Sequence, residues 1–382
     1  MITSRLASRI LATLTLIPSA FCAAGTVDGL EVRGFGSSGI QAANSDYSLP
    51  SAGIDGRNVD YSRLTKAGVN LRSVPLADLA VAAQFVASLK AATFAPEITW
   101  GFVDYEVTSG MHVRAGRLLP PVWLFSQQVD VGFSLPWIDP PREVYSLNPL
   151  RSLNGAALFG RRRLGSGILE YDLIGGGGES LTELSTLSGA ESATLVRIRD
   201  AIGGALSYSW ADILRVRLGY FRARTSIDLY STVPVPGVDY VYSNLRIPFD
   251  ANVGRFYSAG LDLSLGPWSV VGEWARRDLD GTAIPRAEAA YVSAGYEFGR
   301  FKPRATYSKL YKYTGQVRPH PAVARGVSSL QEAECSLTGG LGVQIAEPVM
   351  AKFELSRTES NFDDPGTDFH YWVGRAAVNF VF

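Results

Sequence analysis

The chain has 382 residues, and its 36 basic and 36 acidic side chains give a formal net charge of zero with no basic tract, which argues against a nucleic-acid partner. Hydrophobic residues make up 46% of it and the mean hydropathy is +0.07, yet no window past residue 24 holds the 18 unbroken apolar residues of a membrane helix. Apolar residues are therefore spread thinly, and 39 glycines, 17 tyrosines and 18 phenylalanines favour many strands joined by tight turns.

The N-terminus has the features of a secretory signal peptide. Arg5 and Arg9 precede an apolar stretch at 10–17, and small residues follow up to Ala24. Because the stretch is too short to cross a bilayer as a helix, we predict cleavage after Ala24. The remaining chain would carry 34 basic and 36 acidic residues, a formal charge of −2, and Cys335 as its only cysteine, which excludes an intramolecular disulfide.

Alternation of apolar and polar residues with period two then continues almost to the end of the chain. In the run 259–265 the odd positions are apolar, and the run 349–355 repeats this pattern with Lys352 and Glu354 on its polar face. Such runs predict about sixteen strands, at 30–37, 66–73, 79–90, 97–107, 111–119, 153–164, 167–176, 194–208, 212–225, 254–265, 268–278, 287–298, 301–313, 333–346, 348–359 and 368–382. With no second domain or linker, residues 25–382 are expected to form an all-β, transmembrane antiparallel barrel.

The connections between these strands alternate in length. Brief turns such as 165–166 and 266–267 alternate with long segments at 38–65, 120–152, 177–193, 226–253 and 314–332. Outer-membrane barrels place short turns in the periplasm and long loops outside the cell, whereas a soluble sandwich has no reason to place its long loops at one end. The asymmetry therefore favours the membrane barrel.

The last strand is compatible with a membrane as well. Along 374–382 the even-numbered residues are apolar up to the final Phe382, while Arg375 and Asn379 lie on the other face. A closing strand of a transmembrane barrel needs one lipid-compatible face. This feature alone leaves open an amphipathic strand at the end of a soluble sheet.

In strand number, loop asymmetry, terminal Phe and the position of its longest insertion, 120–152 after the fifth predicted strand, the chain resembles the Gram-negative outer-membrane porins of the general trimeric type. The resemblance implies that 120–152 folds inward as a constriction loop. It also implies a homotrimer in outer-membrane lipid, no cofactor, and a C-terminal strand, ending at Phe382, that the barrel-assembly machinery takes up. The short acidic glycine motif of the general porins' constriction loop is absent, so the resemblance leaves the preferred solute open.

Charged residues on the strands can be assigned to lipid or lumen by parity. An arginine facing lipid at the bilayer midplane costs about 2–4 kcal/mol, so strand arginines that alternate with apolar residues are expected to face the lumen. The expected pore-lining set is Arg114, Arg197, Arg199, Arg215 and Arg217 from strands, with Asp130, Asp139 and Glu143 from the long loop. Opposed charges would set a transverse field across the pore that favours small polar solutes. The alternative is that these charges are solvated, or pair with one another to hold the loop.

Enzyme chemistry finds little support in the sequence. The three histidines have no recognisable nucleophile or metal spacing, and the glycine run 175–178 lacks a following lysine, so we expect neither an enzyme nor a metal or cofactor site. The sequence favours a water-filled channel for passive diffusion of small hydrophilic solutes and ions. Two alternatives stay open: a substrate-specific anion or oligosaccharide channel, and a plugged structural or adhesive barrel.

Overall fold

The structure of the chain is a computed structural model. It describes residues 25–27, 29–45, 54, 58–90, 93–148, 151–185, 191–233, 243–279, 286–313, 333–361 and 368–382. The predicted signal peptide, with its cleavage site after Ala24, and the predicted loop 314–332 lie outside the described residues.

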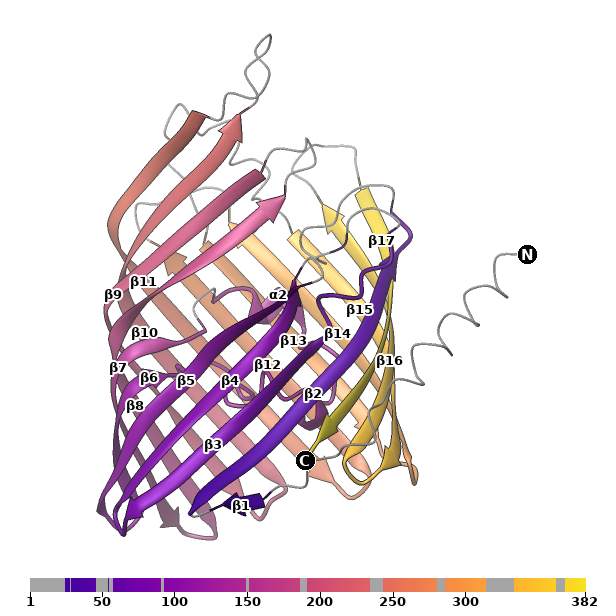
Figure 1. The fold of residues 1–382 in the computed structure, drawn as a ribbon. Coiled ribbons are helices and arrows are strands. Elements are labelled where there is room, and N and C mark those ends of the chain that lie inside the picture. Colours follow the sequence, from indigo (N-terminus) through magenta and orange to yellow (C-terminus); the bar gives the residue numbers. More distant parts are fainter. Residues whose placement is uncertain are drawn as a thin grey trace.

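Sixteen long strands close into one antiparallel barrel (Figure 1), as the alternation predicts. Each strand from β2 to β16 pairs with the next along the chain, and β17 pairs back with β2. A short strand, β1 (Gly25–Val27), forms a hairpin with the start of β2. The long strands are β2 (Leu30–Ala43), β3 (Lys66–Leu76), β4 (Leu79–Lys90), β5 (Thr93–Thr108), β6 (Met111–Leu118), β7 (Leu153–Leu164), β8 (Gly167–Ser185), β9 (Glu191–Trp210), β10 (Leu214–Val233), β11 (Ser243–Leu265), β12 (Trp268–Leu279), β13 (Arg286–Tyr296), β14 (Phe301–Tyr313), β15 (Ala333–Ala346), β16 (Val349–Asn361) and β17 (Asp368–Val381).

The strands have the two faces that their alternation predicts. On β16, Phe353 and Leu355 are half exposed on the outside of the barrel, whereas Lys352 and Glu354 are buried inside it. On β10, Leu218 is exposed on the outside. Side chains that would be costly in lipid thus point into the lumen, and apolar side chains cover the outer wall.

Strands β8 to β11 are longer than predicted, with 19, 20, 20 and 23 residues. Most of the predicted loops 177–193 and 226–253 is therefore strand, and β2 likewise continues past residue 37 to Ala43. Backbone hydrogen bonds can extend a strand beyond the apolar band, where both faces are polar and the period-two signal is lost. Figure 1 shows this part of the wall rising above its neighbours.

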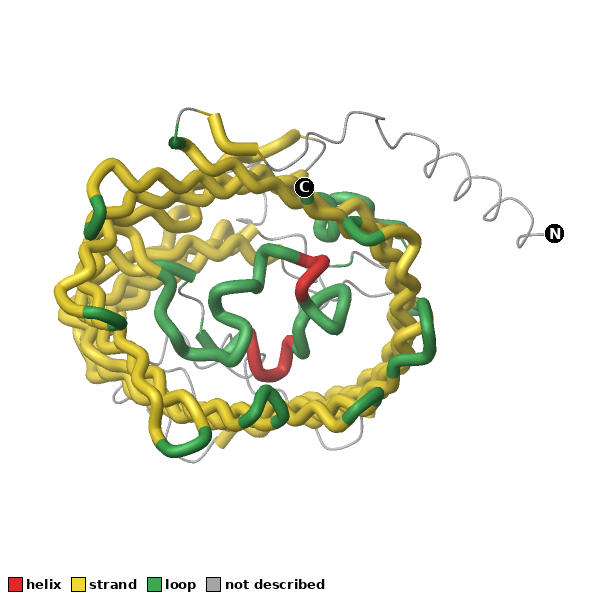
Figure 2. The backbone as a smooth tube through the Cα atoms, turned by 90° about the horizontal axis from the view of Figure 1, so that it is seen from below, coloured by secondary structure: helices red, strands yellow, loops and turns green. Residues whose placement is uncertain are grey.

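The segment between β6 and β7, described at residues 119–148 and 151–152, lies inside the barrel (Figure 2), as expected for an inward-folded loop. It is termed the inner loop below. It contains the 3₁₀ turn η1 (Gly132–Ser134) and one turn of helix, α2 (Arg142–Tyr145). No helix in the described part of the chain has the length and apolar character needed to cross a membrane.

The barrel closes where β17 meets β2, and the terminal Phe takes part. Gly34 N donates to Phe382 O at 2.8 Å, and Phe382 N donates to Gly34 O at 2.9 Å. The rings of Phe382 and Phe380 lie directly over Gly34 and Gly36, so close that a Cβ on either glycine would overlap a ring. A side chain at either position would require the ring over it to move.

Candidate functional site

The inner loop packs against one side of the barrel wall through apolar side chains. Trp123, Phe125, Trp137 and Val144 belong to a buried cluster that continues into the inner faces of β11 to β14. A Cβ added to Gly260 on β11 would lie 2.6 Å from the Cγ of Leu124, so the loop and the wall are in direct contact. The loop is therefore packed against this wall and is not suspended in the middle of the lumen.

A buried carboxylate on β12 fastens two distant points of the loop. Glu273, 4% exposed, accepts a hydrogen bond from Leu124 N at 2.7 Å on one oxygen. Its other oxygen accepts from the hydroxyls of Tyr145, at 2.6 Å, and Tyr291, at 2.7 Å. Because Leu124 and Tyr145 are near opposite ends of the loop, this one side chain holds both ends to β12.

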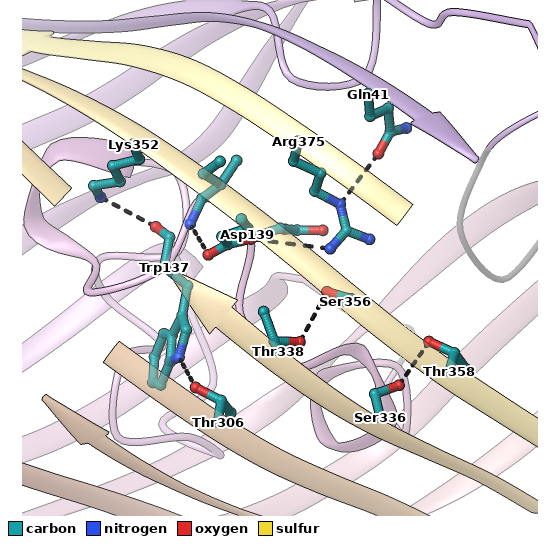
Figure 3. Close-up of polar contacts among 12 residues, drawn as sticks. Gln41, Trp137, Asp139, Thr306, Ser336, Thr338, Lys352, Ser356, Thr358 and Arg375 are labelled. Atoms are coloured by element: carbon teal, nitrogen blue, oxygen red, sulfur yellow. Dashed lines mark hydrogen bonds and ion pairs between the residues drawn. The ribbon is translucent and has the colours of Figure 1, made fainter. Parts of the chain in front are cut away.

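A second set of contacts joins the middle of the loop to β16 (Figure 3). The ammonium of Lys352 donates to three loop carbonyls, Gly132 O and Leu135 O at 2.5 Å and Trp137 O at 3.1 Å. Two residues along the strand, Glu354 accepts from the backbone N–H of Ile138 at 2.8 Å. Charged groups that parity assigns to the lumen thus satisfy loop backbone that would otherwise be buried without partners.

Arg215 and Arg217 of β10 and Arg114 of β6 lie on the inner face of the wall, and each has a partner. Arg217 donates to Pro121 O in the loop at 2.9 Å and to Ser207 Oγ at 3.0 Å. Arg215 donates to a carboxylate oxygen of Asp262 at 3.2 Å. Arg114 donates to Asp104 at 2.6 Å, and its guanidinium also lies 5.1 Å from the centre of the Phe102 ring.

Arg197 and Arg199 lie on the outer face, which corrects their predicted place in the pore. The cause is an extra residue in β9, where Asp200 has φ +50° and the pairing with both neighbouring strands shifts. Below this bulge Ala201 faces inward, and above it Ile198 packs against the same inward cluster, so Arg197 and Arg199 point the other way. Arg197 pairs with Asp228 and lies 3.7 Å from Glu179.

The three predicted loop acids have different surroundings. Asp130, 4% exposed, pairs with Arg151 and lies 3.8 Å from Lys66 of β3. Asp139 is 4.0 Å from Arg63. Glu143 is 6% exposed and has no hydrogen bond or ion pair within the described residues. None of the three forms an ion pair with the predicted arginines within the described residues, and a transverse field between the two sets stays a prediction.

Asp139 and Glu143 instead line a polar pocket between the loop and the inner faces of β14 to β17, termed the α2 pocket below. Its lining includes Asp139, Arg142 and Arg375, together with serine and threonine side chains of β14 to β16 that are termed its floor below. Two hydroxyl pairs bridge neighbouring strands there, Ser336 with Thr358 at 2.9 Å and Thr338 with Ser356 at 2.8 Å (Figure 3).

Arg142 was absent from the predicted set, although it directly precedes Glu143 at the start of a helical turn after two prolines. Burial, together with the nearby guanidiniums of Arg63 and Arg375, lowers the pKa of Arg142 to about 10, against the opposing effect of Asp139. The side chain is still positively charged at neutral pH. The guanidiniums of Arg142 and Arg375 thus line the α2 pocket, and that of Arg63 lies near Arg142.

No protein-family model and no curated protein matches the chain, but many solved structures share its fold. A loop-deletion mutant of OmpT, an outer membrane protein of Vibrio cholerae, is 11% identical with a TM-score of 0.59, over 94% of this chain and 100% of that one. The anion-selective porin from Comamonas acidovorans is 12% identical with a TM-score of 0.57, over 92% and 99%. The outer membrane channel DcaP of Acinetobacter baumannii is 12% identical with a TM-score of 0.55, over 94% and 99%. The chain therefore has the barrel fold of outer-membrane porins and channels, which confirms the predicted resemblance at the level of fold.

Proposed function

We propose that the protein is an outer-membrane porin, a passive water-filled channel for small hydrophilic solutes and ions. It would reach the outer membrane after removal of residues 1–24, assemble as a homotrimer, and act without a cofactor or enzymatic activity. The fold it shares with porins and channels, and the trimeric form among the similar solved structures, support this proposal.

The one observation that carries the proposal is the attachment of the inner loop to one arc of the wall, which runs from β10 through β16 and β17 to β3. Its fastening residues include Arg217 on β10, Glu273 on β12 and Lys352 on β16. The inner faces of β5 and β6 present charged groups such as Asp104 and Arg114. We infer that water and solutes pass between the loop and the wall formed by β4 to β9, so that the loop narrows the barrel without plugging it.

The test is single-channel recording of purified, refolded protein in a planar bilayer under a salt gradient. A porin gives stable current steps, and its reversal potential reports the sign of the field at the narrowing. Folded, heat-modifiable barrels that give no steps would contradict the proposal and favour a plugged, structural or adhesive barrel. A Glu273→Gln variant provides a matched comparison, because a detached loop would change the step size of an open channel.

A substrate-specific channel is the second candidate, and the α2 pocket favours it. Passive diffusion needs only a wide polar path, whereas a polar pocket beside the narrowing could hold a solute for a measurable time. Saturable block of the current by one class of solute would separate the specific channel from the general one.

A further inference from the structure

The α2 pocket contains two side chains of opposite charge that have no partner in the described part of the protein. Arg142 and Glu143, adjacent in α2, both line it. We propose that the α2 pocket is a binding subsite for small zwitterionic solutes of the α-amino acid type. The solute carboxylate would bind Arg142 and its ammonium would bind Glu143. This inference deepens the proposed channel function and rests on it.

Glu143 gives the first step of the argument. The residue is 6% exposed, and within the described residues nothing donates a hydrogen bond to its side chain. A carboxylate in such a confined position loses much of its hydration, and a bound donor compensates for that loss. An ammonium group supplies up to three N–H donors together with the opposite charge.

The guanidiniums in and near the pocket give the second step. Arg142 is half-buried with no hydrogen bond or ion pair to any described residue. Of its two guanidinium neighbours, Arg375 donates a hydrogen bond to Gln41 Oε1 at 3.3 Å. Arg63 lies 4.0 Å from Asp139, and Arg375 lies 3.9 Å from Glu354. A carboxylate bound by Arg142 would form two parallel N–H···O bonds and reduce the repulsion among the three guanidiniums.

The balance of charge decides against a simple anion or cation. The lining of the pocket contains charges of both signs: the basic Arg142 and Arg375, and the acidic Asp139, Glu143, Glu334 and Glu354. Arg63 lies near Arg142, and Lys352 lies near Glu354. An anion that approaches Arg142 would be repelled by Glu143, and a cation that approaches Glu143 would be repelled by Arg142. A zwitterion satisfies both unpaired groups at once and adds no net charge to the pocket.

The floor of the pocket limits the side chain of such a solute. Ser336, Ser356 and Thr358 are all less than a tenth exposed, and their hydroxyls can donate or accept. A polar floor that is already closely packed suits a small or hydroxylated side chain better than a large apolar one. Glycine, alanine and serine are the expected ligands.

The test is single-channel block by four solutes of similar size: alanine, propionate, propylammonium and glycerol. Alanine is expected to block the current saturably and at a concentration at least tenfold below that of the other three. Arg142→Gln and Glu143→Gln should each raise the half-blocking concentration of alanine tenfold or more. Arg300→Gln and Glu347→Gln, which make the same charge changes at exposed turn positions, should leave it unchanged.

Each other outcome overturns the inference. Equal block by glycerol and alanine would indicate a polyol subsite, and block by propionate that survives Glu143→Gln would indicate an anion subsite. Stable current without block by any solute would reject the subsite while leaving the channel intact. If no current is seen, the channel proposal fails. Calorimetric titration of alanine into the folded, heat-modifiable wild type and both variants then tests the subsite separately, and absence of binding to the wild type would reject it.

Discussion

At the scale of single residues, two buried charges largely determine the position of the inner loop. The carboxylate of Glu273 accepts three hydrogen bonds, and the ammonium of Lys352 donates to three backbone carbonyls. Parity alone assigns both residues to the lumen. It could not show that their partners belong to the loop, because an irregular segment has no periodicity from which its path can be read.

Lys352→Met should loosen the inner loop. Methionine fills a similar volume but leaves the carbonyls of Gly132, Leu135 and Trp137 without a donor, and each unsatisfied buried group costs about 1–3 kcal/mol. We expect larger, noisier current steps and earlier cleavage of the loop by added protease. Lys302→Met is the matched control, because Lys302 forms an exposed ion pair with Glu297 at 2.7 Å, and such pairs contribute little. Equal effects of the two variants would contradict this account of the loop.

The turn that leads into β3, at residues 60–65, should be sensitive to acid. Burial alone would raise the pKa of Asp60, but hydrogen bonds from Ser62, Gln41 and the Arg63 backbone outweigh it, so this pKa lies below its ordinary 3.8. A carboxyl whose pKa is lowered by folding stabilises the turn above its unfolded pKa. That stabilisation is lost as the pH falls through the folded pKa.

Pepsin, which is active across this range, can measure the effect. We expect cleavage next to Leu64, which is 7% exposed, to begin in the wild type only as the pH falls below the lowered pKa of Asp60. In Asp60→Ala the same cleavage should already be present at pH 4. Identical cleavage profiles for the two proteins would show that Asp60 does not hold this turn.

At the scale of elements, the strands could be predicted from the sequence, but the bulge in β9 could not. The existence and order of all sixteen long strands follow from alternation, since an apolar outer face recurs at every second residue. One extra residue at Asp200 reverses which alternate residues of β9 face the lumen beyond that point. No local feature of the sequence predicts this extra residue. Prediction therefore succeeded for the strands and failed for Arg197 and Arg199.

The parity change can be tested through ion selectivity. Arg114 lies on the inner face beside Asp104, so Arg114→Gln should shift the reversal potential toward cation selectivity. Arg199→Gln removes the same charge from the outer face and should leave the reversal potential unchanged. A shift in the Arg199 variant as large as that in the Arg114 variant would place Arg199 in the pore after all.

The closing seam should tolerate no side chain at Gly36. A Cβ at this position would lie 2.4 Å from the Phe380 ring, and this contact belongs to the β17–β2 pair that closes the barrel. We expect Gly36→Leu to give little folded, heat-modifiable protein. Gly374→Ala on β17 is the control, because a Cβ there meets nothing within 4 Å. Normal folding of Gly36→Leu would show that the ring can move aside.

At the scale of the whole molecule, the apolar and aromatic side chains on the outer wall indicate where the barrel would lie in the bilayer. The exposed Trp210 and Trp268 lie near the end with short turns. The outward positions of β10 stay apolar or aromatic from residue 214 to Tyr220, and charge begins at Arg222. The eight steps from residue 214 to Arg222, each rising ~3.3 Å along a strand at the tilt of a membrane barrel, span roughly 20 Å, close to the apolar band of such proteins. The upper parts of β8 to β11 then stand in water, which accounts for the outward arginines of β9.

Cysteine labelling on intact cells tests this placement and the direction of the barrel together. In a Cys335→Ser background, Arg224→Cys should react with a membrane-impermeant maleimide, because the Arg224 side chain is 69% exposed beyond the apolar band. Leu218→Cys, exposed within the apolar band, should react only after detergent extraction. If Leu218→Cys reacted on cells and Arg224→Cys did not, the band would be misplaced. If a cysteine at Glu347, in a short turn, reacted in place of Arg224→Cys, the barrel would be inverted and its inner loop would be entered from the opposite side.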